Sequence, residues 1–203
     1  MTEPFWEKSY KDDDVSTFGT IPNRLIKEYE YMFGKSWNIL EICCGEGKNP
    51  LYLASKGFSN INAFDLSDNG IAKLSRTASK NDLSINAWVQ DLRNFQFEKR
   101  YDLITSFGSL HFVEKSDWSS LLLKAKENTN IGGMHIIQIF TNSVPASPDI
   151  ADFAIGIADD GELEKLYHDW AILEFKSFTF EDEHPGVPKH VHSANSIVAQ
   201  RLV

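Results

Sequence analysis

The 203-residue sequence has few cysteines and few basic residues, and it has no long apolar run. Its two cysteines, Cys43 and Cys44, are adjacent, so a bridge between them would be strained, and free thiols fit a reducing compartment. Lys and Arg total 20 against 29 Asp and Glu, a formal net charge of −9 that argues against a phosphate-tracking surface. No run approaches the roughly 20 apolar residues of a membrane span, and the N-terminus lacks the layout of an export signal. We therefore expect a cytoplasmic protein that binds neither nucleic acid nor membrane.

Glycine and proline are also too scarce, at 12 and 7 residues, for a fibrous or low-complexity chain. With 42% hydrophobic and 24% charged residues, the composition is that of a globular protein. The length predicts a single domain over residues 1–203, in which residues 1–30 form an N-terminal lid. No heptad or exposed apolar stripe stands out, so the sequence leaves open whether the chain is a monomer or a homodimer.

Short apolar runs alternate with helical patterns along most of the chain. Strands are predicted at 37–43, 60–65, 84–89, 101–106 and 134–141, the last after a turn at Gly132-Gly133. Helices are predicted at about 50–56, 68–81 (apolar Ile71, Ala72, Leu74 and Ala78), 114–128 and 162–171. Two final strands, 172–180 and 193–203, are joined by the turn-rich segment 181–188, too short for a helical crossover. The fold expected is a doubly wound, mostly parallel, seven-stranded α/β sheet of the Rossmann-like kind, with an antiparallel C-terminal hairpin.

The most informative segment runs from Ile39 to Pro50, where a strand ends, glycines follow and a helix begins. Gly45 and Gly47 allow positive φ and close approach of a ligand to the main chain. Asn49 is expected to be the N-cap and Pro50 the first helical residue. The free N–H groups at the start of that helix suit a carboxylate or a phosphate.

The glycine spacing decides between ligands. The dinucleotide pattern G-x-G-x-x-G would require a third glycine at position 50, where Pro50 stands, whereas a turn built on positions 43, 45 and 47 fits. Asp65 ends the second strand, where an acid grips the hydroxyls of a ribose. Asp91, after the third strand, would accept from the amine of an adenine, although a loop Asp that caps a turn is the better explanation of this residue taken alone. Together these positions predict a nucleotide-like ligand.

Over nearly its whole length the sequence resembles the class I S-adenosylmethionine-dependent methyltransferases, and more narrowly the tellurite-resistance TehB-like group of small-molecule methyltransferases. The glycine turn followed by Lys48-Asn49 and Leu51-Tyr-Leu-Ala54 is similar to that group's G-N-G-R-N-x-x-Y-L-A run. Similar too are the segment 161–170 and a last strand that begins His190-Val-His192. The resemblance implies S-adenosylmethionine as cofactor and S-adenosylhomocysteine as product. One departure is Cys43, where the group usually has glycine, so the turn must tolerate a side chain.

The resemblance also implies roles for individual residues. Glu41, Cys43, Gly45 and Gly47 would hold the methionine part of the cofactor, and Asp65 its ribose. Leu66 and Ser67 would lie beside the adenine, Asp91 and Leu92 would meet its edge, and Ser106 with Phe107 would line the floor near the sulfonium. Asn49 and Gln90 are further cofactor-binding candidates. Aromatic faces stabilise a sulfonium, and Phe5, Trp6, Tyr10 and Phe18 provide them in the N-terminal segment, unless they only fix that segment to the core.

Methyl transfer from a sulfonium is an in-line displacement, in which the protein chiefly aligns the reactants. A base is needed only if the acceptor carries a proton, and His111, His190 and His192 are the candidate catalytic residues. His190 and His192 would share one face of a strand. Two alternatives are exposure at the start of an edge strand, and a metal site with His184 and a nearby acid. No ligand cluster with metal spacing accompanies the pair, so no metal is expected.

The sequence thus predicts methyl transfer to a small molecule: a thiol, a metalloid oxyanion such as tellurite, or a small metabolite. One alternative is a non-catalytic protein that binds S-adenosylmethionine or a partner, for which the acidic stretch 149–164 would offer a surface. A nicotinamide-dependent oxidoreductase is less well supported, because the dinucleotide glycine spacing is not met.

Overall fold

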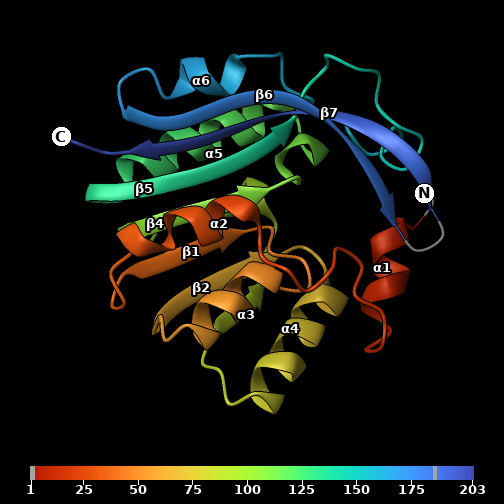
Figure 1. Cartoon of the computed structure of the whole chain (residues 1–203), viewed down its shortest axis with the longest axis horizontal. Coiled ribbons are helices and arrows are strands. Elements are labelled where there is room, and N and C mark those ends of the chain that lie inside the picture. Colours follow the sequence, from red (N-terminus) through yellow and green to blue (C-terminus); the bar gives the residue numbers. More distant parts are fainter. Residues whose placement is uncertain (1–2, 185–186) are drawn as a thin grey trace. The chain divides into compact units, whose positions relative to one another are not determined.

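The computed structural model describes residues 3–184 and 187–203, and these contain a seven-stranded sheet in the order β3-β2-β1-β4-β5-β7-β6 (Figure 1). The pairs β1–β2, β2–β3 and β4–β5 are parallel, whereas β5–β7 and β6–β7 are antiparallel. The predicted mostly parallel α/β sheet with an antiparallel C-terminal hairpin is therefore confirmed. The chain divides into two compact units, Met1–Leu92 and Arg93–Val203.

The first unit alternates strands and helices. Its elements are α1 (Phe5–Tyr10), α2 (Arg24–Tyr29), η1 (Glu30–Met32), β1 (Asn38–Ile42), α3 (Lys48–Ser55), β2 (Asn60–Asp65), α4 (Asp68–Lys80) and β3 (Asn86–Val89), and η2 (Leu92–Asn94) begins at its end. One hydrophobic cluster joins the turn after β1, strand β2 and helix α4 through Cys44, Ala63, Ile71 and Leu74. Burial of these side chains fixes α4 against the sheet.

The second unit ends in a long hairpin. Its elements are β4 (Tyr101–Phe107), η3 (Leu110–Phe112), α5 (Lys115–Glu127), β5 (Thr129–Phe140), α6 (Glu162–Leu166), β6 (Ala171–His184) and β7 (Val187–Gln200). Strand β7 pairs with β5 only through residues 194–200, while its first half pairs with β6 alone. The hairpin consequently continues beyond the end of β5, as the blue strands in Figure 1 show.

Four local predictions are wrong. The helix at 162–171 ends at Leu166, because the buried Tyr167 lies in the turn that leads into β6. Strand β5 begins at Thr129, so Gly132-Gly133 lies inside it, where the register with β4 shifts. Strand β7 begins at Val187 rather than at 193. In α4, Ala72 is exposed and Lys73 is buried in its stead. Of the predicted turn 181–188, residues 185 and 186 lie outside the described residues.

A buried histidine in the second unit is held as a neutral ring. The two ring nitrogens of His135 lie 2.7 Å from the Thr129 hydroxyl and 2.7 Å from the Tyr167 hydroxyl. The ring is fully buried, and burial together with the positive charge of Lys126 lowers its pKa to about 3. Folding therefore opposes protonation of this side chain.

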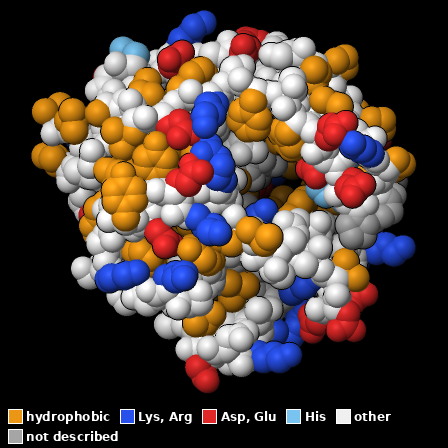
Figure 2. Space-filling model, viewed as in Figure 1, with side chains coloured by type: hydrophobic (Ala, Val, Ile, Leu, Met, Phe, Trp, Pro, Cys, Tyr) orange, Lys and Arg blue, Asp and Glu red, His pale blue; other side chains and the backbone are white. Residues whose placement is uncertain are grey.

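On the face shown in Figure 2, Lys and Arg side chains are interspersed with Asp, Glu and apolar side chains. None of the helices among the described residues combines the length and apolarity needed to cross a membrane.

Candidate cofactor site

The turn after β1 takes the backbone conformation that its glycines predict. Cys43, Gly45 and Gly47 all have positive φ, at 56°, 55° and 84°. The Cys44 N–H donates to the Phe64 carbonyl at 2.9 Å, which ties the turn to the end of β2, and the Gly47 N–H donates to the Cys44 carbonyl at 2.9 Å. The departure from glycine at position 43 therefore puts a side chain in the left-handed region, which costs about 1–2 kcal/mol.

Asp65, at the end of β2, braces this turn. Its Oδ2 accepts from the Gly45 N–H at 2.7 Å, and its Oδ1 accepts from the Ser67 N–H at 2.9 Å. Burial raises the pKa of the carboxyl, and those two N–H groups oppose the rise. Each carboxylate oxygen retains a further acceptor position, so Asp65 would accept from hydroxyl groups while holding the turn.

Asn49 is not the N-cap of α3, contrary to expectation. Helix α3 begins at Lys48, with Gly47 in the cap position, and Asn49 is buried inside the first turn. Its amide donates to the buried Glu41 carboxylate at 2.8 Å, and its carbonyl oxygen accepts from the Asn23 N–H at 2.8 Å. Asn49 therefore joins the end of β1 to the N-terminal segment.

Tyr10, on α1, covers the glycine turn. A Cβ at Gly45 would lie 2.5 Å from the Tyr10 hydroxyl, so the ring rests on the bare backbone. Burial and the nearby charges of Asp65 and Glu46 hold the pKa of Tyr10 well above its usual value, and the phenol stays neutral. The ring of Phe18 lies 6.4 Å from that of Tyr10 and 6.1 Å from that of Phe5.

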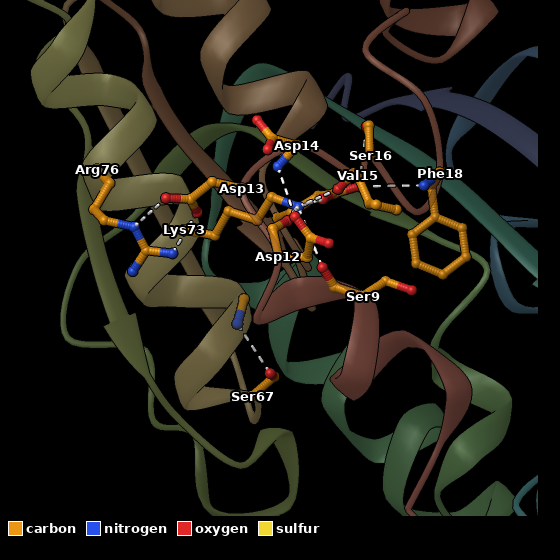
Figure 3. A network of polar contacts seen from close by, with 12 residues as sticks. Ser9, Asp12, Asp13, Asp14, Val15, Ser16, Phe18, Ser67, Lys73 and Arg76 are labelled. Carbon is orange, nitrogen blue, oxygen red and sulfur yellow. Dashed lines mark hydrogen bonds and ion pairs between the residues drawn. The ribbon is translucent and has the colours of Figure 1, made fainter. Parts of the chain in front are cut away.

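Lys73 attaches the N-terminal segment to α4 (Figure 3). Its ammonium donates to the Asp12 carbonyl at 2.8 Å, to the Ser9 carbonyl at 3.5 Å, and to the Val15 carbonyl. The same ammonium lies 2.8 Å from the Glu46 carboxylate, and both side chains are under 10% exposed. A buried ammonium of this kind is tolerated because an opposite charge lies beside it and backbone carbonyl oxygens accept from it.

Two further contacts extend this attachment. The other oxygen of Glu46 accepts from the Ser16 hydroxyl and the Phe18 N–H, each at 3.2 Å. One turn beyond Lys73, Arg76 forms an ion pair with Asp13 at 2.6 Å, but both side chains are more than half exposed. The segment 9–18 thus depends chiefly on the buried pair.

The residues predicted around the adenine lie at the ends of β2 and β3. Leu66 is 63% exposed, directly after Asp65. The Ser67 hydroxyl accepts from the Gly70 N–H at 3.0 Å and so caps α4. The Gln90 N–H donates to the Asp65 carbonyl at 2.8 Å, and the Gln90 amide donates to the Asp91 carbonyl at 2.9 Å. Leu92 is buried at the start of η2. The first unit therefore brings most of the predicted cofactor residues onto one set of strand ends.

The remaining predicted residues lie in the second unit. Ser106 and Phe107 end β4, and the buried Ser106 hydroxyl lies 3.2 Å from that of Ser109. His111 is fully buried, with neither ring nitrogen hydrogen-bonded among the described residues, and burial lowers its pKa to about 3. Its ring stacks on Phe140 at 4.4 Å.

His190 and His192 lie on the same face of β7, as their spacing predicts, with ring centroids 4.6 Å apart. Their side chains are 8% and 3% exposed, so the alternative of an exposed pair is wrong. Both face Asp149. Asp149, Lys73 and Glu46 were not predicted as site residues: the first lies in a loop far along the chain, and the other pair carries no motif.

The family model of the tellurite resistance protein TehB matches residues 31–183. A curated Haemophilus influenzae protein, the probable S-adenosyl-L-methionine-dependent methyltransferase TehB, is 32% identical over 139 residues, which cover 68% of this chain and 47% of that protein. The chain thus spans about half the length of the curated relatives it matches.

Two solved structures share the fold. The crystal structure of Haemophilus influenzae TehB superposes with a TM-score of 0.77 at 24% identity, covering 89% of this chain and 62% of that one. The Synechocystis magnesium protoporphyrin IX methyltransferase, crystallised with bound S-adenosylmethionine, superposes with a TM-score of 0.63 at 13% identity, covering 99% and 86%. Since the family model covers most of the chain, this protein belongs to the TehB family.

Proposed function

We propose that this protein is an S-adenosylmethionine-dependent methyltransferase that acts on a small molecule. The observation that carries the proposal is the glycine turn after β1, with three residues at positive φ and the strand-end carboxylate of Asp65 bonded to it. The family membership and the names of the curated relatives support the same activity.

The residues of the first unit fit this cofactor. The N–H groups of Cys44, Gly45 and Gly47 are already bonded within the protein, so the start of the eight-residue helix α3 is what offers backbone N–H groups for a carboxylate. Asp65 has acceptor positions left for ribose hydroxyls, and the exposed Leu66 provides an apolar surface for an adenine beside it. Glu41, Gln90, Asp91 and Leu92 complete the proposed set of the first unit, and the roles of Ser106 and Phe107, on β4 of the second unit, stay predictions.

When bound, the cofactor supplies an electrophilic methyl group on a positively charged sulfur. The chain's own task is to position the acceptor in line with that methyl and to keep water out, and orientation alone lowers such barriers by several kcal/mol, up to about 7–11 kcal/mol in ideal cases. The aromatic rings of Tyr10 and Phe18 would favour the positive charge by about 0.5–2 kcal/mol. No covalent bond to a side chain is required.

We also propose that residues 1–30 act as a lid within one methyltransferase domain. Tyr10 lies on the Gly45 backbone, and the buried pair of Lys73 and Glu46 fastens the segment 9–18 above the same turn. Within it, the segment 9–18 would open without unfolding the sheet, whereas the buried Leu25 and Ile26 would stay packed on the core.

The acceptor is proposed as a small thiol, a metalloid oxyanion such as tellurite, or a small metabolite. Calorimetric titration should show binding of S-adenosylmethionine and S-adenosylhomocysteine but not of NAD. Binding of NAD alone would favour an oxidoreductase instead. A screen with methyl-labelled cofactor over thiols, tellurite, selenite, halides and amines would then identify the acceptor. Tight cofactor binding without transfer to any of them would favour a non-catalytic protein.

The role of Asp65 has a sharper test, because the residue also braces the turn. Asp65→Asn should weaken S-adenosylhomocysteine binding by more than about tenfold, since charge-assisted hydrogen bonds are lost. The 2′-deoxyribose analogue should bind the wild type more weakly than the parent compound, yet bind Asp65→Asn about as well as the parent compound does. If the analogue binds more weakly than the parent compound by the same factor in both proteins, the role of Asp65 is limited to holding the turn. Asp68→Asn, an exposed neighbour, is the matched control.

A further inference from the structure

Three metal-ligating side chains converge in the second unit. Asp149 Oδ2 lies 3.3 Å from His190 Nε2 and 3.8 Å from His192 Nε2, and the three ligand atoms lie within 4.8 Å of one another. The side chains are only 2%, 8% and 3% exposed. Their convergence does not follow from the proposed cofactor site, all but two of whose residues lie in the first unit.

The hydrogen bond at the far side of His190 fixes its tautomer. His190 Nδ1 lies 2.7 Å from the Pro188 carbonyl oxygen, which can only accept, so Nδ1 carries the proton. In the neutral ring, Nε2 is then unprotonated, and its lone pair points toward a carboxylate oxygen. The buried Nε2 makes no hydrogen bond within the described part of the chain, although Asp149 is near. Two facing acceptors at this distance require a cation between them.

Ser147 fixes the same tautomer of His192, with the proton on Nδ1. The Ser147 hydroxyl donates to Asp149 Oδ1, so it must accept from His192 Nδ1, which lies 3.2 Å away. The Nε2 of His192 is therefore also a lone pair facing Asp149. Both histidines thus direct an Nε2 lone pair to one carboxylate oxygen, and each donates its Nδ1–H to another oxygen. Metal-bound histidines show this second hydrogen bond almost invariably.

The spacing of the donor atoms suits a transition metal. With bonds of about 2.1 Å, two donors on one ion lie about 3.0 Å apart at a right angle and about 3.4 Å apart at the tetrahedral angle. The observed 3.3 and 3.8 Å from Asp149 Oδ2 need only a small contraction, and all three donor atoms lie within 4.8 Å of one another. A proton on His190 Nε2 is the competing cation: the 3.3 Å separation is within ion-pair distance, but the two atoms do not form a hydrogen bond. A divalent ion would also offset the buried negative charge of Asp149.

We propose that Asp149, His190 and His192 bind a divalent first-row transition metal ion. Two imidazoles and one carboxylate are the donors that zinc and ferrous iron accept, and three protein ligands leave positions open for water or a small anion. The aromatic rings of Phe140 and Phe180, with centroids 4.3 and 5.4 Å from that of His192, hold its ring in place. This site requires no methyl transfer, and it would make the two histidines ligands rather than bases.

For such a site the sequence suggested His184 and a nearby acid, and only the acid is found beside the two histidines. His184, at the end of β6, lies with its Nε2 3.5 Å from Asp182 and is not one of the three converging groups. Asp149 takes that place from the loop between β5 and α6.

Zinc binding tests the proposal. Calorimetric titration of the tag-free wild-type chain with Zn²⁺ should show one site, and Mg²⁺, which prefers oxygen ligands, should not compete. Asp149→Asn and His190→Gln should each weaken Zn²⁺ binding by at least about 100-fold, and Ser147→Ala by about tenfold, since it orients two ligands. His168→Gln replaces an exposed histidine away from the cluster and should leave binding unchanged.

A spectroscopic measurement keeps the test valid if a variant fails to fold. In the wild type, Zn²⁺ should shift the Nε2 resonances of two histidines and leave their Nδ1 protons in place in ring ¹⁵N spectra. Absence of Zn²⁺ binding, binding that survives both Asp149→Asn and His190→Gln, or shifts at Nδ1 would each overturn the proposal.

Discussion

Removal of the Lys73 charge should release the N-terminal segment, whereas removal of the neighbouring Arg76 charge should not. Lys73→Met keeps most of the apolar stem but leaves Glu46 buried without its partner at 2.8 Å. Breaking a buried pair costs about 3–5 kcal/mol. The lower end applies here, because Glu46 still accepts from Ser16 and Phe18. At about 1.4 kcal/mol per factor of ten, the open population of the segment should rise by about 100-fold.

Amide hydrogen exchange over residues 9–18 measures this opening directly. Arg76→Met is the matched control, since it lies one turn away on α4, contacts the same segment and is more than half exposed. Exposed pairs contribute little, so exchange should barely change in that variant. Adding Glu46→Gln to Lys73→Met should recover part of the loss, because the orphaned charge is removed. Equal acceleration in Lys73→Met and Arg76→Met would refute the reasoning.

Three further predictions concern the turn and the buried histidine. Gly47→Ala should lower the free energy of unfolding in urea titrations by about 2–5 kcal/mol, because the new Cβ would lie 2.4 Å from the fully buried Leu74 side chain. Gly57 has a similar φ but open space around it, so Gly57→Ala should lower the free energy of unfolding only by the backbone cost of about 1–2 kcal/mol. Cys43→Gly should be tolerated and Cys43→Val should lower the melting temperature, since a β-branched residue is most strained at positive φ; the reverse order would contradict the turn geometry. The pKa of His135 is about 3 in the folded chain, below its unfolded value of about 6.5, so stability decreases as the pH is lowered through that window, by at most about 1.4 kcal/mol per pH unit. Between about pH 4 and 7, a window set by these pKa values, His135→Gln should reduce the slope of stability against pH in denaturation curves. An unchanged slope would exclude His135 as a cause.

Several parts of the site could be predicted because their signals are local. The positions of Gly45, Gly47 and Asp65 follow from where strands end, and that in turn follows from runs of apolar residues and the turn chemistry beside them. The shared face of His190 and His192 follows from the two-residue period of a strand. Asn49 shows the limit of such rules: its type and position suit a cap, but a buried carboxylate on β1 recruits its side chain instead.

By itself, the sequence determined the alternation of strands and helices, the place of the glycine turn and the family. Only the tertiary structure decided that Lys73, not Ala72, faces inward on α4, and that Asp149 meets two histidines of β7. The physical reason is that periodicity and turn chemistry act over a few neighbouring residues, whereas a buried ion pair or a ligand cluster is stable only when distant segments supply all its partners at once. No single segment carries the signal for such a group.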